Sequence, residues 1–331
     1  MNSFDIFNGD ADGLCGITQL RLANPKRSTC ITGVKRNNIL LNDARLSANS
    51  QLTVVDISLH SNLRGLTQAL DQGCSVEWFD HHHPGVIPKH RNLVTHIDTD
   101  PHVCSSLIIN KLLKNRFVHW AIVAAFGDNL KGSGYSLATT CGTPQVTIDV
   151  LKDLGVCINY NSYGACIEDL HYHPETLYNI MQEFDEPINL VAETDILPTL
   201  KEHYEADLTS ARNAPVKAIN DYVAIAILPN AKWARRINGL YANTLSNHFP
   251  DRAHAILIEK SDGYTASIRA PQNNPLNAHQ VALKFETGGG RHTAAGIQHL
   301  PADQISYLER ELTRHYCPHL PSTILRISNS P

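Results

Sequence analysis

The chain has 331 residues, of which 42% are hydrophobic and 18% are charged, and its formal net charge is −4 at pH 7. This length predicts two domains, each with enough apolar residues for a core of its own. This acidic net charge excludes the broad basic surface that a protein needs in order to bind long nucleic acids.

The sequence also indicates in which cellular compartment the protein is expected. No apolar run is long enough to span a membrane, and a predicted strand at Phe4 leaves no room for a signal peptide. The eight cysteines include no C-x-x-C pair and no zinc spacing, which is typical of small buried side chains rather than of a disulfide framework. We therefore expect a cytoplasmic protein without a membrane partner.

Short apolar runs that end near an aspartate recur through the first part of the chain. The runs are Phe4–Phe7 before Asp10 and Asp12, Leu52–Val55 before Asp56, Val76–Phe79 before Asp80, His81 and His82, and Trp120–Phe126 before Asp128. Such runs predict buried strands of a parallel sheet, with helices at 13–22, 61–73 and 107–113 between strands. Because ligands bind at the carboxyl ends of strands in open α/β sheets, we expect these side chains to meet at one edge.

So many carboxylates at one edge predict a site for two divalent cations, since the charges would otherwise repel each other. The D-x-D spacing sends Asp10 and Asp12 to different sides of one turn, one for each cation, and Asp56 is placed to bridge them. Mixed carboxylate and imidazole ligands favour Mn²⁺, with Mg²⁺ as the alternative. The competing interpretation is that the acids are unrelated turn residues and that the His81–His83 run is solvated.

Ser105 and Ser106 stand at the start of the third predicted helix. In that position their side chains can cap the helix, or the helix N-terminus can bind an anion. Beyond this point the periodicity from 139 to 185 predicts helices that complete an N-terminal domain. A connector with a helix at 200–211 follows at 189–230.

The second domain is predicted at 231–318, with a frayed tail at 319–331. Its predicted elements are helices at 233–249, 276–285 and 302–316 and a hairpin of strands at 253–259 and 264–269. The run Gly288, Gly289 and Gly290 lets a backbone come close to an anion and expose its N–H groups. Alternatively, the run is a mobile loop.

Two arginines accompany the glycine run. Arg291 follows it directly, and its planar fork of donors is well shaped for a phosphate. Arg269 ends the second strand of the predicted hairpin. The alternative for both is a surface ion pair.

Four motifs, in order, resemble those of the DHH phosphoesterase superfamily. They are Asp10-Ala11-Asp12-Gly13, Asp56, Asp80-His81-His82 and Asp128, and the segment from Gly288 to Gly296 is similar to the GGGHxxAAG motif of the DHHA1 domain. The resemblance implies an α/β fold in two parts: a parallel-sheet DHH domain at 1–188 with helices on both faces, and a smaller α/β DHHA1 domain at 231–318. It further implies an active site in the cleft between them.

The resemblance also implies roles for individual residues. Asp10, Asp12, Asp56, His81 and Asp128 are the implied metal ligands, and Asp80 is implied to accept the ring N–H of His81. His82 is implied to face the phosphate as a donor or general acid. Arg269 resembles the family's other arginine that contacts phosphate.

The chain departs from the family pattern at two places. Asn8 stands where an aspartate often precedes the D-x-D pair in the nuclease branch, so Asn8 offers one of the metals a neutral oxygen at best. Arg291 stands at the position of the motif histidine, and His292 follows one residue later. Which of the two fills the role of the histidine stays open.

The implied activity is metal-dependent phosphodiester hydrolysis. The acidic two-domain chain favours a small nucleotide substrate, a linear 5′-phosphorylated dinucleotide such as pGpG, cut to nucleoside 5′-monophosphates. The alternatives are a pAp phosphatase, a cyclic dinucleotide phosphodiesterase, an exopolyphosphatase and a non-catalytic nucleotide sensor. The oligomeric state stays open, with a homodimer as one option.

Overall fold

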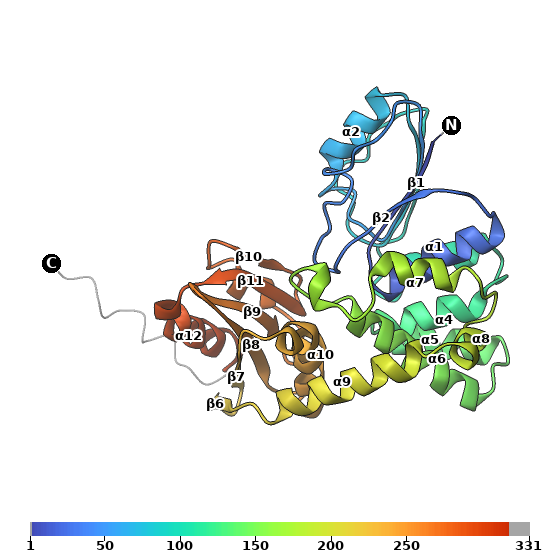
Figure 1. The fold of residues 1–331 in the computed structure, drawn as a ribbon. Helices are drawn as coiled ribbons and strands as arrows, with labels where there is room; N and C mark the ends of the chain where they lie inside the picture. The colour runs from blue at the N-terminus through green and yellow to red at the C-terminus, as the bar shows by residue number, and fades with distance from the viewer. Residues whose placement is uncertain (1, 318–331) are drawn as a thin grey trace. The chain divides into compact units, whose positions relative to one another are not determined.

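The computed structural model describes residues 2–317, and the chain divides after Glu205 into two compact units, each with its own sheet (Figure 1). The predicted tail at 319–331 lies outside the described residues. Within the described part, no helix combines the length and the apolar character that crossing a membrane requires.

The first unit contains a five-stranded sheet in which every pair of neighbours is parallel, in the order β2-β1-β3-β4-β5. The strands are β1 (Ser3–Phe7), β2 (Thr29–Ile31), β3 (Gln51–Val55), β4 (Ser75–Asp80) and β5 (Leu93–Ile97). The predicted parallel α/β architecture is therefore confirmed. Parallel strands end at the same edge, so the residues that follow β1, β3 and β4 are brought together.

Some helices of the first unit lie on the two faces of this sheet, and the others pack on these helices and on one another. They are α1 (Ala11–Ala23), α2 (Leu63–Asp71), α3 (Ser105–Leu112), α4 (Val118–Gly127), α5 (Lys131–Thr140), α6 (Gln145–Asn161), α7 (Pro174–Met181), α8 (Pro187–Glu193) and the first part of α9 (Ile196–Arg212). Side chains alternate between the faces of a strand. Ile6 therefore belongs to the core with Leu66 of α2, whereas Phe7 belongs to the core with Leu14 of α1 and Ile122 of α4.

One predicted strand is wrong. The run Trp120–Phe126 lies in the helix α4, which ends immediately before Asp128. Every residue of the run is buried, so the helix has no polar face that would reveal its 3.6-residue period. An apolar run of this length is compatible with either a buried strand or a buried helix, and the packing between α1 and α6 decides for the helix.

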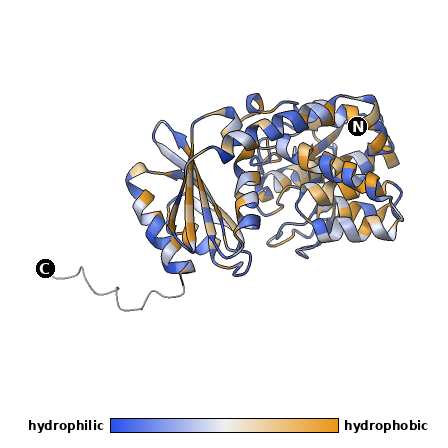
Figure 2. Cartoon of the chain, turned by 90° about the horizontal axis from the view of Figure 1, so that it is seen from below, coloured by the Kyte–Doolittle hydropathy of each residue, from blue (hydrophilic) through white to orange (hydrophobic). Residues whose placement is uncertain are grey.

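The second unit contains a six-stranded mixed sheet in the order β10-β11-β9-β8-β7-β6. Its strands are β6 (Val216–Asn220), β7 (Val223–Leu228), β8 (Ala253–Lys260), β9 (Gly263–Arg269), β10 (Gly288–Gly290) and β11 (Ala294–Leu300), and its helices are α10 (Lys232–His248), α11 (Ala278–Ala282) and α12 (Ile305–Tyr316). Figure 2 shows hydrophobic stretches along these strands. The predicted hairpin of β8 and β9 is confirmed. The predicted connector at 189–230 contains β6 and β7, and both belong to the second sheet.

A buried histidine makes the stability of the second unit depend on pH. His254 in β8 is 1% exposed, and burial, with Arg252 nearby, lowers its pKa from 6.5 to about 4. The folded unit therefore binds fewer protons than the unfolded chain between these two values. Stability from this group is complete above pH 6.5 and is lost as the pH falls through about 4.

We predict that His254→Leu removes most of this dependence. In the wild type the loss between the two pKa values amounts to about 3 kcal/mol, from 1.36 kcal/mol for each unit of pKa. The pH dependence of the free energy of unfolding is measured in urea at a series of pH values, with hydrogen exchange in peptides from β8 as the probe. An unchanged slope in the variant would show that other groups cause the dependence.

Candidate metal centre

The D-x-D pair lies where β1 passes into α1. Asp10 is the N-cap of α1, and its Oδ1 accepts a hydrogen bond from the N–H of Gly13 over 3.0 Å. Asp12 lies in the first turn of α1, and its two oxygens accept from the backbone N–H groups of Ser105 and Ser106 over 2.7 and 2.8 Å. The two carboxylates therefore have different partners although they are two residues apart.

These contacts decide between the two predictions for Ser105 and Ser106. The N-terminus of α3 does bind an anion, but the anion is the carboxylate of Asp12. The N-cap residue is Cys104, and no side chain caps the helix, so the predicted capping by serine is wrong. The Ser106 hydroxyl donates to the backbone oxygen of Asp12 over 2.8 Å, and the Ser105 hydroxyl lies 3.4 Å from Asp56 Oδ1.

Asp56 turns the chain sharply at the end of β3. Its φ of 56° lies in the left-handed region, which an aspartate tolerates better than most residues. Its backbone N–H still donates to Phe79 of β4 over 2.9 Å, so the turn is tied to the neighbouring strand. A rare backbone conformation held in this way points to a functional constraint on the side chain.

The two imidazoles after β4 have different hydrogen-bond partners. His81 Nδ1 donates to the backbone oxygen of Val103 over 3.0 Å, which leaves Nε2 as the acceptor nitrogen, 3.4 Å from Asp56 Oδ1 and 3.9 Å from Asp128 Oδ2. His82 Nδ1 donates to Asp80 Oδ1 over 2.7 Å. Asp80 thus orients His82, and the prediction that it accepts the ring N–H of His81 is wrong.

A lysine that the sequence analysis did not consider lies among the carboxylates. Lys35 Nζ is 2.5 Å from Asp10 Oδ2, 3.6 Å from Asp128 Oδ1 and 3.0 Å from Asn159 Oδ1. Lys35 follows β2, whose carboxyl end lies at the same edge as those of β1 and β3. The signal that could have found it was therefore the position of a single cation after a strand of the same sheet.

Repulsion dominates the electrostatics of this cluster. Burial, together with the charges of Asp10, Asp12 and Asp128, raises the pKa of Asp56 well above its usual value. Burial likewise raises the pKa of Asp128, although Lys35 acts in the opposite direction. The cluster therefore favours additional positive charge.

Asp10 and Lys35 stabilise each other's charged forms. Burial would raise the pKa of Asp10, but the Lys35 ammonium and the hydrogen bonds from Lys35, Gly13 and Asp56 together lower the pKa below its usual value. Burial would lower the pKa of Lys35, but Asp10, with Tyr163 and Asp128, holds the pKa well above its usual value. Lys35 therefore offsets only part of the negative charge of the carboxylates at this edge.

The residues present fit divalent cations. Asp56, His81 and His82 each offer a ligand atom, and these atoms lie within 4.8 Å of one another. Asn8 Oδ1 is buried and has no hydrogen-bond donor among the described residues, which suits a neutral oxygen ligand or a partner of a bound water. Carboxylate and imidazole together suit Mn²⁺.

The second unit shows why two of the three glycines are needed. A Cβ on Gly288 would lie 1.8 Å from the backbone oxygen of Ala282, and one on Gly290, whose φ is 144°, would lie 2.4 Å from Ala295 Cα. A Cβ on Gly289 would meet nothing within 4 Å. The run lies in β10, paired with β11, and not in a loop.

The predicted cations of the second unit differ in their surroundings. Arg269 Nε donates to Asn243 Oδ1 over 2.8 Å, which places its guanidinium beside α10. Arg291 and His292 are exposed. The His292 ring contacts the ring of His279 at 4.3 Å between centroids. Packing against His279 thus orients His292, whereas the Arg291 side chain makes no ion pair within residues 2–317.

Comparison with known proteins gives a likeness in fold. No protein-family model matches the chain, and no curated protein matches its sequence. Among solved structures, exonuclease RecJ bound to manganese is similar with a TM-score of 0.60 and 16% identity, over 99% of this chain and 92% of that chain. A DHH-domain protein described as a member of a family of ribosomal proteins is similar with a TM-score of 0.58 and 13% identity, over 95% of this chain and 86% of that chain.

A third structure has a narrower description. The pGpG-specific phosphodiesterase PggH from Vibrio cholerae is similar with a TM-score of 0.55 and 10% identity, over 96% of this chain and 99% of that chain. At these identities, the likeness concerns the path of the backbone through both units.

We predict that Lys35→Met destabilises the metal-free protein. Loss of a largely buried cation leaves Asp10 uncompensated, at a cost of about 2 kcal/mol, which lowers the Tm of the first unit by roughly 4–8 °C. Because bound cations replace the lost charge, Mn²⁺ should raise the Tm of the variant more than that of the wild type. Thermal unfolding in EDTA and in Mn²⁺ measures both effects.

Lys89→Met is the matched control, since Lys89 is exposed. It should leave the Tm unchanged under both conditions. A loss of stability in Lys35→Met that is the same with and without Mn²⁺ would contradict the electrostatic explanation.

Proposed function

The chain has the fold of the DHH-domain proteins, and from this premise we propose that it is a metal-dependent phosphodiesterase of short linear oligonucleotides. Its proposed substrate is a 5′-phosphorylated dinucleotide such as pGpG, and its products are nucleoside 5′-monophosphates. The observation that carries the proposal is the cluster of Asp10, Asp12, Asp56, Asp128 and His81 at the carboxyl edge of the first sheet.

The proposed cofactors are two divalent cations, with Mn²⁺ preferred over Mg²⁺. Asp10, Asp12, Asp56, His81 and Asp128 would hold them, with Asn8 as a neutral oxygen beside them. When bound, such cations supply a hydroxide at neutral pH and neutralise the non-bridging oxygens of the phosphate. The RecJ structures described as bound to manganese and to Mg²⁺ support a divalent cation.

The hydrogen bonds of the imidazoles support a division of labour between them. The bond to Val103 fixes the tautomer of His81 and presents Nε2 to the carboxylates, as a metal ligand requires. The carboxylate of Asp80 accepts from Nδ1 of His82 and so fixes the orientation of that ring. His82 is then suited to carry a proton at Nε2 and to give it to the leaving oxygen.

The charge balance supports a short substrate. A net charge of −4 and the carboxylate cluster leave few cations to follow a long phosphate backbone. The likeness to PggH, which is described as pGpG-specific, agrees with a dinucleotide.

We propose that the second unit holds a phosphate of this substrate. Gly289 has open space where a side chain would be, so its backbone is accessible to a phosphate oxygen. Arg291 is exposed next to it and can add a fixed positive charge. Arg269 and His292, each held by a neighbouring side chain, are further candidates for contact with the substrate.

The proposed function predicts Mn²⁺-dependent release of GMP from pGpG, with rates that fall steeply from the dinucleotide to a 24-mer. Asp56→Asn should lose Mn²⁺ and reduce kcat/KM by about two orders of magnitude or more, because a shared carboxylate ligand is removed. Metal content after desalting and product chromatography measure these effects. Asp71→Asn, at an exposed end of α2, is the matched control. Equal rates on the dinucleotide and the 24-mer would argue against the substrate, and full activity in Asp56→Asn would argue against the site.

A second prediction tests the role of the glycine run. Gly289→Ala should leave the Tm unchanged, because its Cβ meets no atom within 4 Å. It should raise the KM for pGpG about tenfold, because the new methyl group would keep the phosphate away from the backbone, and leave that for GpG, which lacks the 5′-phosphate, unchanged. Gly288→Ala, by contrast, should lower the Tm, since its Cβ would overlap the Ala282 oxygen. An equal change for pGpG and GpG would show that Gly289 does not contact the terminal phosphate.

A further inference from the structure

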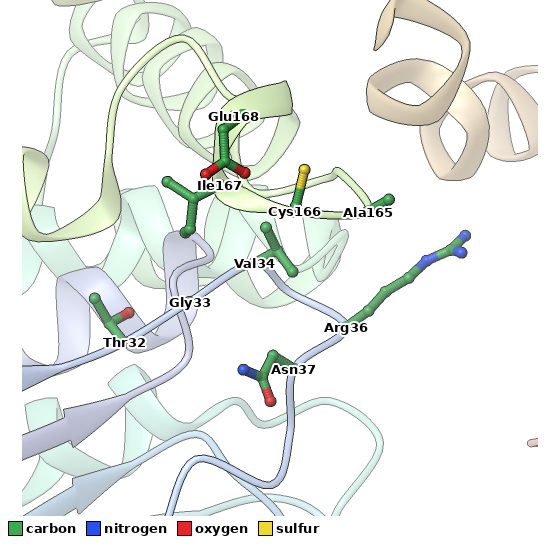
Figure 3. Close-up of a pocket in the computed structure, with 9 residues that line it drawn as sticks. All are labelled: Thr32, Gly33, Val34, Arg36, Asn37, Ala165, Cys166, Ile167 and Glu168. Carbon is green, nitrogen blue, oxygen red and sulfur yellow. The ribbon is translucent and has the colours of Figure 1, made fainter. Parts of the chain in front are cut away.

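A pocket of about 460 Å³ lies in the first unit, and Figure 3 shows the side chains that line it. Two segments form it, one following β2 and one following α6. The backbone N–H of Lys35 donates to the backbone oxygen of Ser162 over 2.9 Å, which joins the two segments. Because Lys35 also contacts Asp10, a single residue links the wall of the pocket to the carboxylates.

The pocket has the size and the walls that a nucleoside requires. Its volume falls within the range of about 300–1,000 Å³ that small-molecule sites occupy. Val34 and Ile167 supply apolar surface for the faces of a base. Thr32 lines the same pocket, and its hydroxyl has no hydrogen-bond partner among the described residues.

The polar side chains of the pocket are complementary to guanine. Arg36 and Asn37 make no side-chain hydrogen bond or ion pair within residues 2–317, and both can donate to the O6 and N7 acceptors of guanine. Glu168, which lies away from Arg36 on the other segment, has a carboxylate whose chemistry allows it to accept from the N1–H and N2–H₂ donors of guanine. Adenine presents an acceptor, N1, where guanine presents N1–H, so a carboxylate at this edge disfavours adenine.

We propose that this pocket is a guanine-selective subsite, which binds the nucleoside of a guanosine nucleotide whose phosphate reaches the carboxylate cluster. Arg36 and Asn37 contact the O6 side of the base, Glu168 contacts its N1 side, and Val34 and Ile167 contact its faces. The subsite rests on the proposed function for the identity of the reaction. Binding of the base does not depend on that reaction.

Two variants test the subsite. Glu168→Gln keeps the size of the side chain and removes its charge and one acceptor, and Arg36→Ala removes the donors. Each should lower the ratio of kcat/KM for pGpG to that for pApA by about tenfold, the discrimination that one good contact to a base edge gives. Glu183→Gln and Arg45→Ala, both at exposed positions outside the pocket, should leave the ratio unchanged. Equal effects on pGpG and pApA would overturn the subsite while leaving the phosphodiesterase activity in place.

A binding measurement separates failure of the subsite from failure of the proposed function. Titration calorimetry with GMP and AMP requires no turnover. We expect the full chain to bind GMP about tenfold more tightly than AMP, and Glu168→Gln to remove the preference. If no substrate is hydrolysed but this preference is observed, the function is wrong and the subsite stands. If GMP and AMP bind equally, the subsite is wrong whatever the activity.

Discussion

Mutual repulsion of carboxylates at one edge of a parallel sheet is the constraint on which the first unit depends. The structure offsets it with a different partner for each acid. Asp12 is held by the N-terminus of α3, Asp10 by Lys35 and by the first turn of α1, and Asp80 by His82. Asp56 retains a raised pKa because it is buried and because its neighbours are mostly carboxylates. The site therefore requires α3, β2 and β4 to lie where the fold places them.

The fold was predictable where the sequence has an unambiguous period and was not where burial hides the period. β1, β3 and β4 are short apolar runs bounded by polar turns, and the sheet requires such runs to be buried on both faces. The run from Trp120 to Phe126 has the same composition, but α4 is surrounded by other helices and needs no polar face. Local sequence does not distinguish the two cases, because the difference lies in what packs around them.

The site was predictable as a set of residues, but its hydrogen bonds were not. The order of the acids along the chain follows from the parallel topology, since each acid follows a strand or a helix that ends at the same edge. Which imidazole Asp80 contacts depends on a turn in which both His81 and His82 are near, and Val103 decides it by taking the ring N–H of His81. Lys35 was missed for a different reason. It comes from the loop after an edge strand, and only the tertiary structure shows that its ammonium reaches Asp10.

The same structure separates residues that hold a motif in place from residues that remain available for chemistry. Gly288 and Gly290 are required by the backbone of Ala282 and Ala295, whereas no neighbouring atom requires Gly289 to be a glycine. In the first unit, the oxygens of Asp12 already accept two backbone N–H groups, whereas His81 Nε2 is directed at Asp56 and Asp128. A carboxylate oxygen has more than one lone pair, so Asp12 can serve α3 and a cation together. Binding of a cation by Asp12 is thereby coupled to the docking of α3, and through the Ser106 hydroxyl to the backbone of α1. This coupling explains why a motif with two carboxylates two residues apart needs a second helix, contributed from far along the chain, to become a rigid site.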